Sequence, residues 1–308
     1  MNCSVVVPVY RGEATIEALV ERLSKVLPGT ADQFELILVD DGSPDDSWGV
    51  IGRLTRRYDW VRGLRLTRNF GQDNAIFSGI LESRFEVVAT LDDDLQHEPE
   101  DLPRLLAKLV EGYDVVYGVL RVRRQVWWKS LLSSAVKRGI SFITGLAAVR
   151  GMSSFRVFRA QAVRNAYETV TGPDISVDVL LSWIFRRFSA VDIEEAPRAQ
   201  GTSTYGLFKL VRLSLRILTN YTTVPLRLAS LLGFFFTLVG IGVFLYVLTI
   251  YFTLGSIPGF PFLASVMTIF SGVQLFGLGI IGEYLARVFE RSSGRPRFAI
   301  QERLGGGG

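Results

Sequence analysis

Three consecutive carboxylates, Asp92, Asp93 and Asp94, come directly after an apolar run at residues 87–91. Such a run predicts a buried strand, which would hold the three carboxylates together at its end. Like charges held this close are unfavourable unless a cation neutralises them. Carboxylate oxygens are ligands for Mg²⁺ and Mn²⁺, which often connect a protein to the phosphates of a substrate. Without further context, the triplet fits an acidic turn or helix start equally well.

The first 120 residues alternate between short apolar runs and segments with apolar residues at helical spacing. The predicted strands are residues 3–10, 34–39, 61–66, 86–91 and 114–119, and the predicted helices are residues 15–27, 45–58, 71–83 and 99–111. This alternation predicts an α/β fold with a mainly parallel sheet between helices. Ligands of such sheets bind at the carboxyl ends of the strands. Tyr10, Asp40, Asp41 and the triplet all stand there, so one pocket could collect them.

The pattern changes after residue 120. Residues 125–146 form an amphipathic, basic segment, which fits either a helix packed on the sheet or a helix lying on lipid. The adjacent Trp127 and Trp128 favour lipid. Further on, the sequence predicts strands at residues 153–159 and 191–195, a helix at residues 177–187 and a second basic amphipathic helix at residues 205–221.

A long stretch without charge, between Arg227 and Glu283, predicts a membrane hairpin. Residues 228–252 and 262–281 are each long enough to cross about 30 Å of hydrocarbon. Arginines flank the pair on both outer sides, which predicts that the catalytic part and both termini are cytoplasmic. We therefore expect a catalytic domain at residues 1–204, a juxtamembrane helix at 205–227, two membrane helices at 228–285 and a basic tail at 286–308.

The amino-acid composition limits the classes of binding partner that the protein could have. The formal net charge is +4, and the basic residues gather beside the apolar region, which favours an anionic membrane or a phosphorylated substrate over nucleic acid. The single cysteine, Cys3, excludes an internal disulfide and a cysteine metal cluster. The one histidine, His97, could be a metal ligand. With no second histidine or cysteine nearby, we expect it in a surface or loop position instead.

Several motifs occur together in a fixed order. They are SVVVPVY at residues 4–10, VDDGS at 39–43, RNFGQ at 68–72 with Ala75 and Gly79, LDDDLQ at 91–96, GEY at 282–284 and RPRF at 295–298. With this set the chain resembles inverting family 2 glycosyltransferases of the GT-A fold. More narrowly, it resembles the polyprenyl-phosphate glycosyltransferases, such as dolichyl-phosphate mannose synthase and the bacterial undecaprenyl-phosphate glucosyl- and aminoarabinosyltransferases. The resemblance covers essentially the whole chain.

The resemblance implies a nucleotide-sugar donor, by analogy UDP-linked, and a polyprenyl-phosphate acceptor. Asp92, Asp94 and Gln96 would hold Mg²⁺ or Mn²⁺, and Asp93 replaces a residue that is usually small. The donor would contact Pro8, Tyr10, Glu13, Asp40, Asp41, Arg68, Asn69, Gln72, Asp92 and Asp93. The resemblance also implies a bilayer partner and assembly as a homo-oligomer.

The acceptor side of the site is implied in the same way. Arg156 and Arg198 would act with Asp92 and Asp94 in catalysis by contacting phosphates. The lipid phosphate would be bound by Arg198, Ser203, Tyr205 and Lys209. Two residues depart from the family's pattern: Thr204 stands where relatives carry lysine, and Arg150 stands where many carry aspartate.

Two other functions fit the same motifs. A processive polysaccharide synthase of the same superfamily typically carries Q-x-x-R-W, and this sequence has no such pentapeptide. A catalytically silent membrane scaffold is suggested by Thr204 and Arg150, but the complete acidic motif and Gln96 argue against it. Transfer of one sugar to a lipid phosphate is the leading interpretation. An ionised phosphate needs no strong general base, which suits a site without a catalytic histidine.

Overall fold

The computed structural model describes residues 1–120, 153–169, 176–193, 224–255, 259–293 and 296–305. The chain divides into two compact units. One is Met1–Ser203 with Gly294–Gly308, and the other is Thr204–Ser293. The predicted interfacial segment at residues 125–146 and the predicted helix at residues 205–221 lie outside the described residues, as do Arg150 and Thr204.

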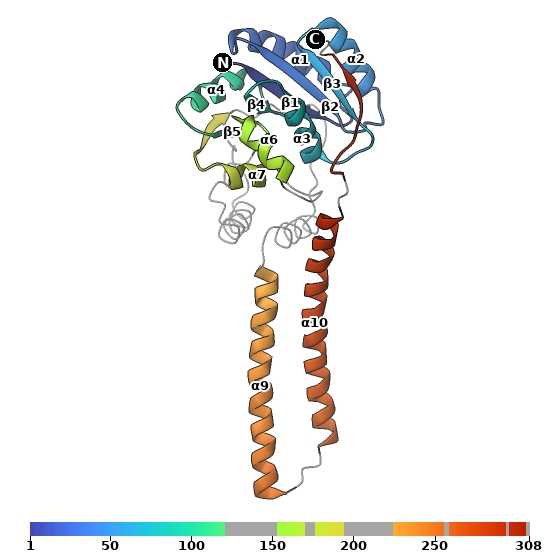
Figure 1. Ribbon diagram of the computed structural model, residues 1–308, viewed down its shortest axis with the longest axis vertical. Coiled ribbons are helices and arrows are strands. Elements are labelled where there is room, and N and C mark those ends of the chain that lie inside the picture. The colour runs from blue at the N-terminus through green and yellow to red at the C-terminus, as the bar shows by residue number, and fades with distance from the viewer. Residues whose placement is uncertain (121–152, 170–175, 194–223, 256–258, 294–295, 306–308) are drawn as a thin grey trace. The chain divides into compact units, whose positions relative to one another are not determined.

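The first unit is built around a mixed sheet (Figure 1). Its strands are β1 Cys3–Val9, β2 Phe34–Asp40, β3 Val61–Leu66, β4 Val87–Thr90, β5 Val115–Leu120, β6 Arg156–Arg159, β7 Phe188–Ile193 and β8 Ile300–Leu304. Their order in the sheet is β7-β5-β6-β4-β1-β2-β3-β8. The pairings of β1 with β2, β1 with β4, β2 with β3 and β5 with β7 are parallel. The pairings of β6 with β4 and β5, and of β8 with β3, are antiparallel.

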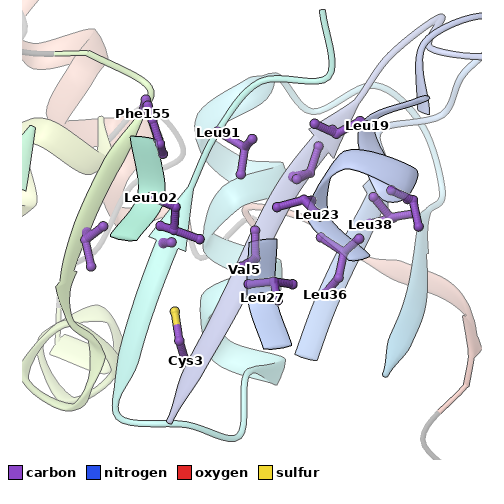
Figure 2. Packing of buried hydrophobic residues seen from close by; sticks show 14 of the residues in the cluster. Cys3, Val5, Leu19, Leu23, Leu27, Leu36, Leu38, Leu91, Leu102 and Phe155 are labelled. Carbon is purple, nitrogen blue, oxygen red and sulfur yellow. The ribbon is translucent and has the colours of Figure 1, made fainter. Parts of the chain in front are cut away.

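Helices cover both faces of this sheet. They are α1 Ile16–Val26, α2 Ser47–Arg57, α3 Gln72–Glu82, α4 Leu102–Val110, α6 Ala160–Thr169 and α7 Val177–Ile184, with short 3₁₀ turns η1 Leu27–Gly29 and η2 Pro99–Asp101. Because side chains alternate along a strand, each strand supplies both layers of core. On one face, Val5, Leu36 and Leu38 pack against α1 (Figure 2). On the other face, Val6, Ile37 and Val39 pack in a cluster with α3, α6 and α7.

The first core also encloses Cys3, which is fully buried (Figure 2). Burial raises the pKa of the Cys3 thiol to about 12, so the thiol stays protonated near neutral pH. Cys3 therefore acts as a small apolar core residue.

The close approach of α3 to β1 depends on Gly79. A Cβ atom at this position would lie 2.3 Å from Val6 Cγ1. We expect Gly79→Ala to lower the free energy of unfolding by about 1–3 kcal/mol, because β1 and α3 would have to move apart. Thermal unfolding measures this effect. Gly29→Ala is the matched control, since no atom lies within 4 Å of its Cβ position. Equal stability of the two variants would contradict the prediction.

Two elements of this unit were not predicted. Helix α6 begins directly after β6, and β8 lies in the region that we expected to be a basic tail. β8 pairs with β3 and forms the edge of the sheet, and the Trp48 indole donates to Glu302 Oε2 at 3.2 Å. The pairing extends beyond the strand, because the Thr67 N–H donates to the Ala299 carbonyl at 3.0 Å. Several predicted boundaries also differ: β6 begins at Arg156 rather than at residue 153, α7 ends at Ile184 rather than at residue 187, and β7 begins at Phe188 rather than at residue 191.

The second unit contains two long helices, α9 Val224–Leu254 and α10 Phe260–Ser292. They contact each other through the rings of Phe236 and Phe270, whose centroids lie 6.2 Å apart. Within the described residues, one helical stretch is long and apolar enough to cross a membrane: Leu228–Thr253 of α9, with a mean hydropathy of 2.5. In α10 the apolar stretch is shorter, Phe270–Ala286. Both predicted helices form. The second predicted span, residues 262–281, overlaps the apolar stretch of α10, but within the described residues that stretch is too short to count as a membrane span.

Candidate active site

The acidic triplet lies where the topology of the sheet reverses. From β1 the chain continues to β2 and β3 on one side, and then returns to place β4 on the other side of β1. Open α/β sheets bind ligands at such a point, outside the carboxyl ends of the strands. A pocket of about 350 Å³ lies there, lined by Pro8, Val9, Tyr10, Asp41, Asn69, Gly71, Gln72, Asp92, Asp93 and Asp94.

Asp92 is held by side chains from two other segments. Gln72 Nε2 donates to Asp92 Oδ1 at 2.6 Å, and Ser154 Oγ donates to Asp92 Oδ2 at 2.5 Å. Gln72 begins α3, and Ser154 stands just before β6. Burial raises the pKa of Asp92, while the bond from Ser154 opposes that rise. The orientation of Asp92 is therefore fixed by its neighbours.

Asp93 packs against the segment that follows β1. A Cβ atom on Gly12 would lie 2.5 Å from Asp93 Oδ2, so the absence of a side chain at Gly12 makes room for this carboxylate. Asp93 Oδ2 is buried without a hydrogen-bond partner. Burial, and then the charge of Asp92, raise the pKa of Asp93 to about 7, although a hydrogen bond from the Tyr10 backbone opposes this. Sequence reasoning had left the role of Asp93 open.

Three potential metal ligands converge beside the pocket. Ligand atoms of Asp92, Asp94 and His97 all lie within 4.8 Å of one another. His97 lies in a loop, as expected, but it is buried and not at the surface. Its Nε2 lies 3.4 Å from Ser153 Oγ, and its Nδ1 is buried without a partner. The two carboxylates suit Mg²⁺ or Mn²⁺, whereas the imidazole nitrogen is a softer donor that fits a transition metal such as Mn²⁺ better than it fits Mg²⁺. Gln96 follows in the same loop, and its N–H donates to Asp94 Oδ1 at 3.1 Å.

Asp41 organises the opposite wall of the pocket. Its two oxygens accept from the backbone N–H groups of Phe70 at 2.7 Å and Gly71 at 2.8 Å. These bonds fix the loop that carries Asn69 and Gln72 to the pocket. Burial raises the pKa of Asp41, and the two N–H groups oppose that rise.

Arg156 lies beneath the site, not on its surface. It is 2% exposed and forms an ion pair with Asp178 of α7. The Tyr117 hydroxyl also donates to Asp178 Oδ1, at 3.0 Å. Arg156 Nε donates to Thr90 Oγ1 at 3.2 Å, and Thr90 Oγ1 donates to the Ser154 carbonyl at 2.7 Å. This guanidinium is thus engaged with protein groups, and its contact with a phosphate stays a prediction.

The remaining predicted residues are placed as follows. Asp40 is fully buried, accepts from the Ser43 N–H at 2.9 Å and lies 3.5 Å from Arg65 Nε. Glu13 is exposed and accepts from the Asp46 N–H at 3.2 Å. The Arg68 guanidinium stacks on the Phe70 ring at 4.8 Å. None of Glu13, Asp40, Arg68 and Gln96 contributes to the pocket lining given above. The predicted acceptor residues lie outside the described part of the chain: Arg198, Ser203, Tyr205 and Lys209.

This arrangement agrees with the similarity of the chain to known proteins. Residues 4–168 match the family described as Glycosyl transferase family 2. The chain is 35% identical over 98% of its length to an undecaprenyl-phosphate 4-deoxy-4-formamido-L-arabinose transferase of Shewanella sediminis, of which the match covers 92%. A protein of the same name from Proteus mirabilis is 34% identical, over 98% of this chain and 94% of that protein. The chain belongs to glycosyl transferase family 2.

The fold of this family 2 glycosyltransferase is also found in solved structures. Glucosyl-3-phosphoglycerate synthase of Mycobacterium tuberculosis, in complex with Mn²⁺, UDP and glucosyl-3-phosphoglycerate, matches with a TM-score of 0.50 and 18% identity. The match covers 71% of this chain and 77% of that one. At this identity the likeness concerns the fold, and it confirms the predicted GT-A architecture of the catalytic part.

Sequence reasoning missed three residues near the site of the glycosyltransferase: Gly12, Ser154 and Asp178. It considered His97 as a metal ligand but favoured a surface or loop position. The dipeptide Ser153-Ser154 just before β6 was a visible signal, because hydroxyls beside a predicted acidic site are natural donors to its carboxylates. Asp178 gave no comparable signal. It reaches Arg156 only because α7 packs against the sheet.

Proposed function

We propose that this glycosyltransferase moves one sugar from a nucleotide sugar, UDP-linked, to an undecaprenyl-type polyprenyl phosphate. The transfer inverts the anomeric centre, depends on Mg²⁺ or Mn²⁺ and takes place at the cytoplasmic face of the membrane. The observation that carries the proposal is the convergence of the acidic triplet and Asp41 on one pocket at the switch point of the sheet. The named relatives support the acceptor class, since the similarity spans nearly the whole chain.

In this proposal, the described residues would form the donor half of the site. Asp92, Asp94 and His97 would hold the divalent ion, with Gln96 as the alternative ligand that the motif predicts. When bound, the ion would offset the negative charge of the departing nucleoside diphosphate. Gln72 and Ser154 keep Asp92 in a fixed orientation, and Asp41 keeps the 68–72 loop against the pocket. A site whose groups are already oriented loses little free energy in ordering them when the donor binds.

The acceptor chemistry fits this set of side chains. A phosphate monoester has a second pKa of about 6, so near neutral pH its oxygen is already an anion and needs no strong general base. The single histidine of the sequence is buried beneath the triplet and is better placed as a ligand than as a base. The long apolar helix α9 would hold the enzyme at the membrane that contains the lipid acceptor.

Transfer of label tests the proposal directly. Membranes expressing the full chain should move radiolabelled sugar from one member of a panel of UDP- and GDP-sugars into the lipid fraction when undecaprenyl phosphate is supplied. EDTA should abolish the transfer, and added Mn²⁺ or Mg²⁺ should restore it. Label that enters only a polymer would favour the processive synthase. Nucleotide-sugar binding without turnover on any polyprenyl phosphate would favour the silent scaffold.

A further inference from the structure

Arg11 has an unusual backbone conformation for its residue type. Its φ is +60°, in the left-handed region that side chains with a Cβ atom rarely adopt. In the described part of the chain, the other residue besides glycine with positive φ is Leu95. Arg11 follows the pocket residue Tyr10, and Leu95 follows the pocket residue Asp94. Backbone strain of this kind concentrates at functional sites, where the surrounding structure stabilises it.

The side chain of Arg11 is available for a ligand. Arg11 is exposed, and its guanidinium stacks over the Tyr10 ring, 5.5 Å from the centroid. Its backbone N–H donates to Ser43 Oγ at 3.2 Å, which holds the turn in place without engaging the guanidinium. Among the described residues, no carboxylate forms an ion pair with Arg11. A guanidinium held at a pocket rim without an acidic partner can bind phosphate oxygens bidentately.

The neighbours of Arg11 place it close to the acidic triplet, where the diphosphate of the donor would bind. Both of its neighbours contact the acidic triplet: the Tyr10 backbone bonds to Asp93, and the Cβ position of Gly12 lies 2.5 Å from Asp93 Oδ2. The pocket lining contains four carboxylates, Asp41, Asp92, Asp93 and Asp94, and no basic side chain. A diphosphate that enters this pocket therefore needs positive charge from the rim as well as from a metal ion.

We propose that Arg11 is a donor-recognition residue whose guanidinium binds the diphosphate of the nucleotide sugar. The inference rests on the proposed function for the identity of the donor. It adds a residue that lies outside the motifs that led to that function. The left-handed backbone at Arg11 would then be retained because it directs this side chain to the pocket rim.

Calorimetric titration of the full-length protein with UDP in the presence of Mn²⁺ tests the proposal. Arg11→Asn removes the guanidinium, while asparagine tolerates the left-handed backbone, so the variant should keep its thermal stability. We expect its Kd for UDP to rise about tenfold, as for the loss of one charge-assisted contact. Arg57→Asn is the matched control, since Arg57 is also exposed and stacks on a tyrosine, Tyr58, at 5.3 Å on α2. Its Kd should not change.

The outcomes separate this inference from the proposed function. Wild-type affinity for UDP in the Arg11→Asn variant would overturn the role of Arg11 and leave the donor assignment intact. An equal loss of affinity for UDP and for uridine would also overturn it, because the contact would then be to the nucleoside. A wild-type protein that binds neither UDP nor GDP would overturn the donor assignment itself, and the role of Arg11 with it.

Discussion

Replacing Asp94 by asparagine is expected to reduce sugar transfer by at least about 100-fold at saturating donor, because it removes a charged ligand from the proposed metal site. Asp94 is exposed at the pocket and lies in the group formed with Asp92 and His97, so the substitution leaves the core untouched. The initial rate of lipid-linked sugar formation measures the loss. Mn²⁺ affinity, measured without donor or acceptor, should fall in parallel.

Asp59→Asn is the control for this substitution, since Asp59 is an exposed acid in the turn before β3. Its rate should equal that of the wild-type protein. Wild-type activity in Asp94→Asn, or activity that persists in EDTA, would contradict the metal assignment. Comparing Mn²⁺ affinity in His97→Ala and Gln96→Ala then distinguishes the ligand set grouped in the structure from the set that the motif predicts. The larger loss identifies the true third ligand.

Local periodicity explains why much of the fold could be predicted. The alternation of apolar runs with helical segments is a property of neighbouring residues, and it placed β1 to β5 and α1 to α4 close to their observed bounds. It also placed Tyr10, Asp41 and the triplet at strand ends. Because parallel strands bring their carboxyl ends to one edge, Tyr10, Asp41 and the triplet met in one pocket as predicted, whereas Asp40, predicted with them, is buried outside the pocket lining.

The elements that were missed depend on contacts between distant segments. β8 has the sequence IQERL, whose charged residues carry no strand signal, and it becomes a strand because the edge of β3 is free to pair with it. His97 was expected in a surface or loop position because no second histidine or cysteine lies nearby in sequence, and it does lie in a loop. It is, however, buried against Phe155, with ring centroids 5.6 Å apart, since β6 packs beside β4. Long-range pairing of this kind leaves no periodic trace in the sequence.

Replacing Asp178 by asparagine is expected to lower the free energy of unfolding by about 3–5 kcal/mol, although Asp178 lies outside every predicted motif. The reason is that Arg156 is 2% exposed and would lose the carboxylate with which it forms an ion pair. For a catalytic unit of this size, the thermal midpoint should fall by about 10 °C or more. Thermal unfolding of the full-length protein measures the effect.

The pair formed by Asp114 and Arg187 is the matched control. These side chains lie 3.3 Å apart, but Arg187 is 69% exposed, so Asp114→Asn should cost about 1 kcal/mol or less. The double variant Arg156→Met with Asp178→Leu should recover most of the stability lost in Asp178→Asn, because the buried guanidinium and the carboxylate paired with it are removed together. If Asp178→Asn and Asp114→Asn destabilise the protein equally, the buried pair is not the cause.

The same substitution should also reduce activity at temperatures where the variant is fully folded. Arg156 donates a hydrogen bond to the Thr90 hydroxyl, and that hydroxyl donates to the Ser154 carbonyl. The Ser154 hydroxyl in turn donates to Asp92. Once Arg156 loses its partner, this series of hydrogen bonds no longer fixes the orientation of Asp92. We expect a fall in kcat of about 10- to 100-fold, the usual effect of losing an outer-shell partner of a metal site. Wild-type kcat in folded Asp178→Asn would show that Asp178 stabilises the fold without positioning Asp92.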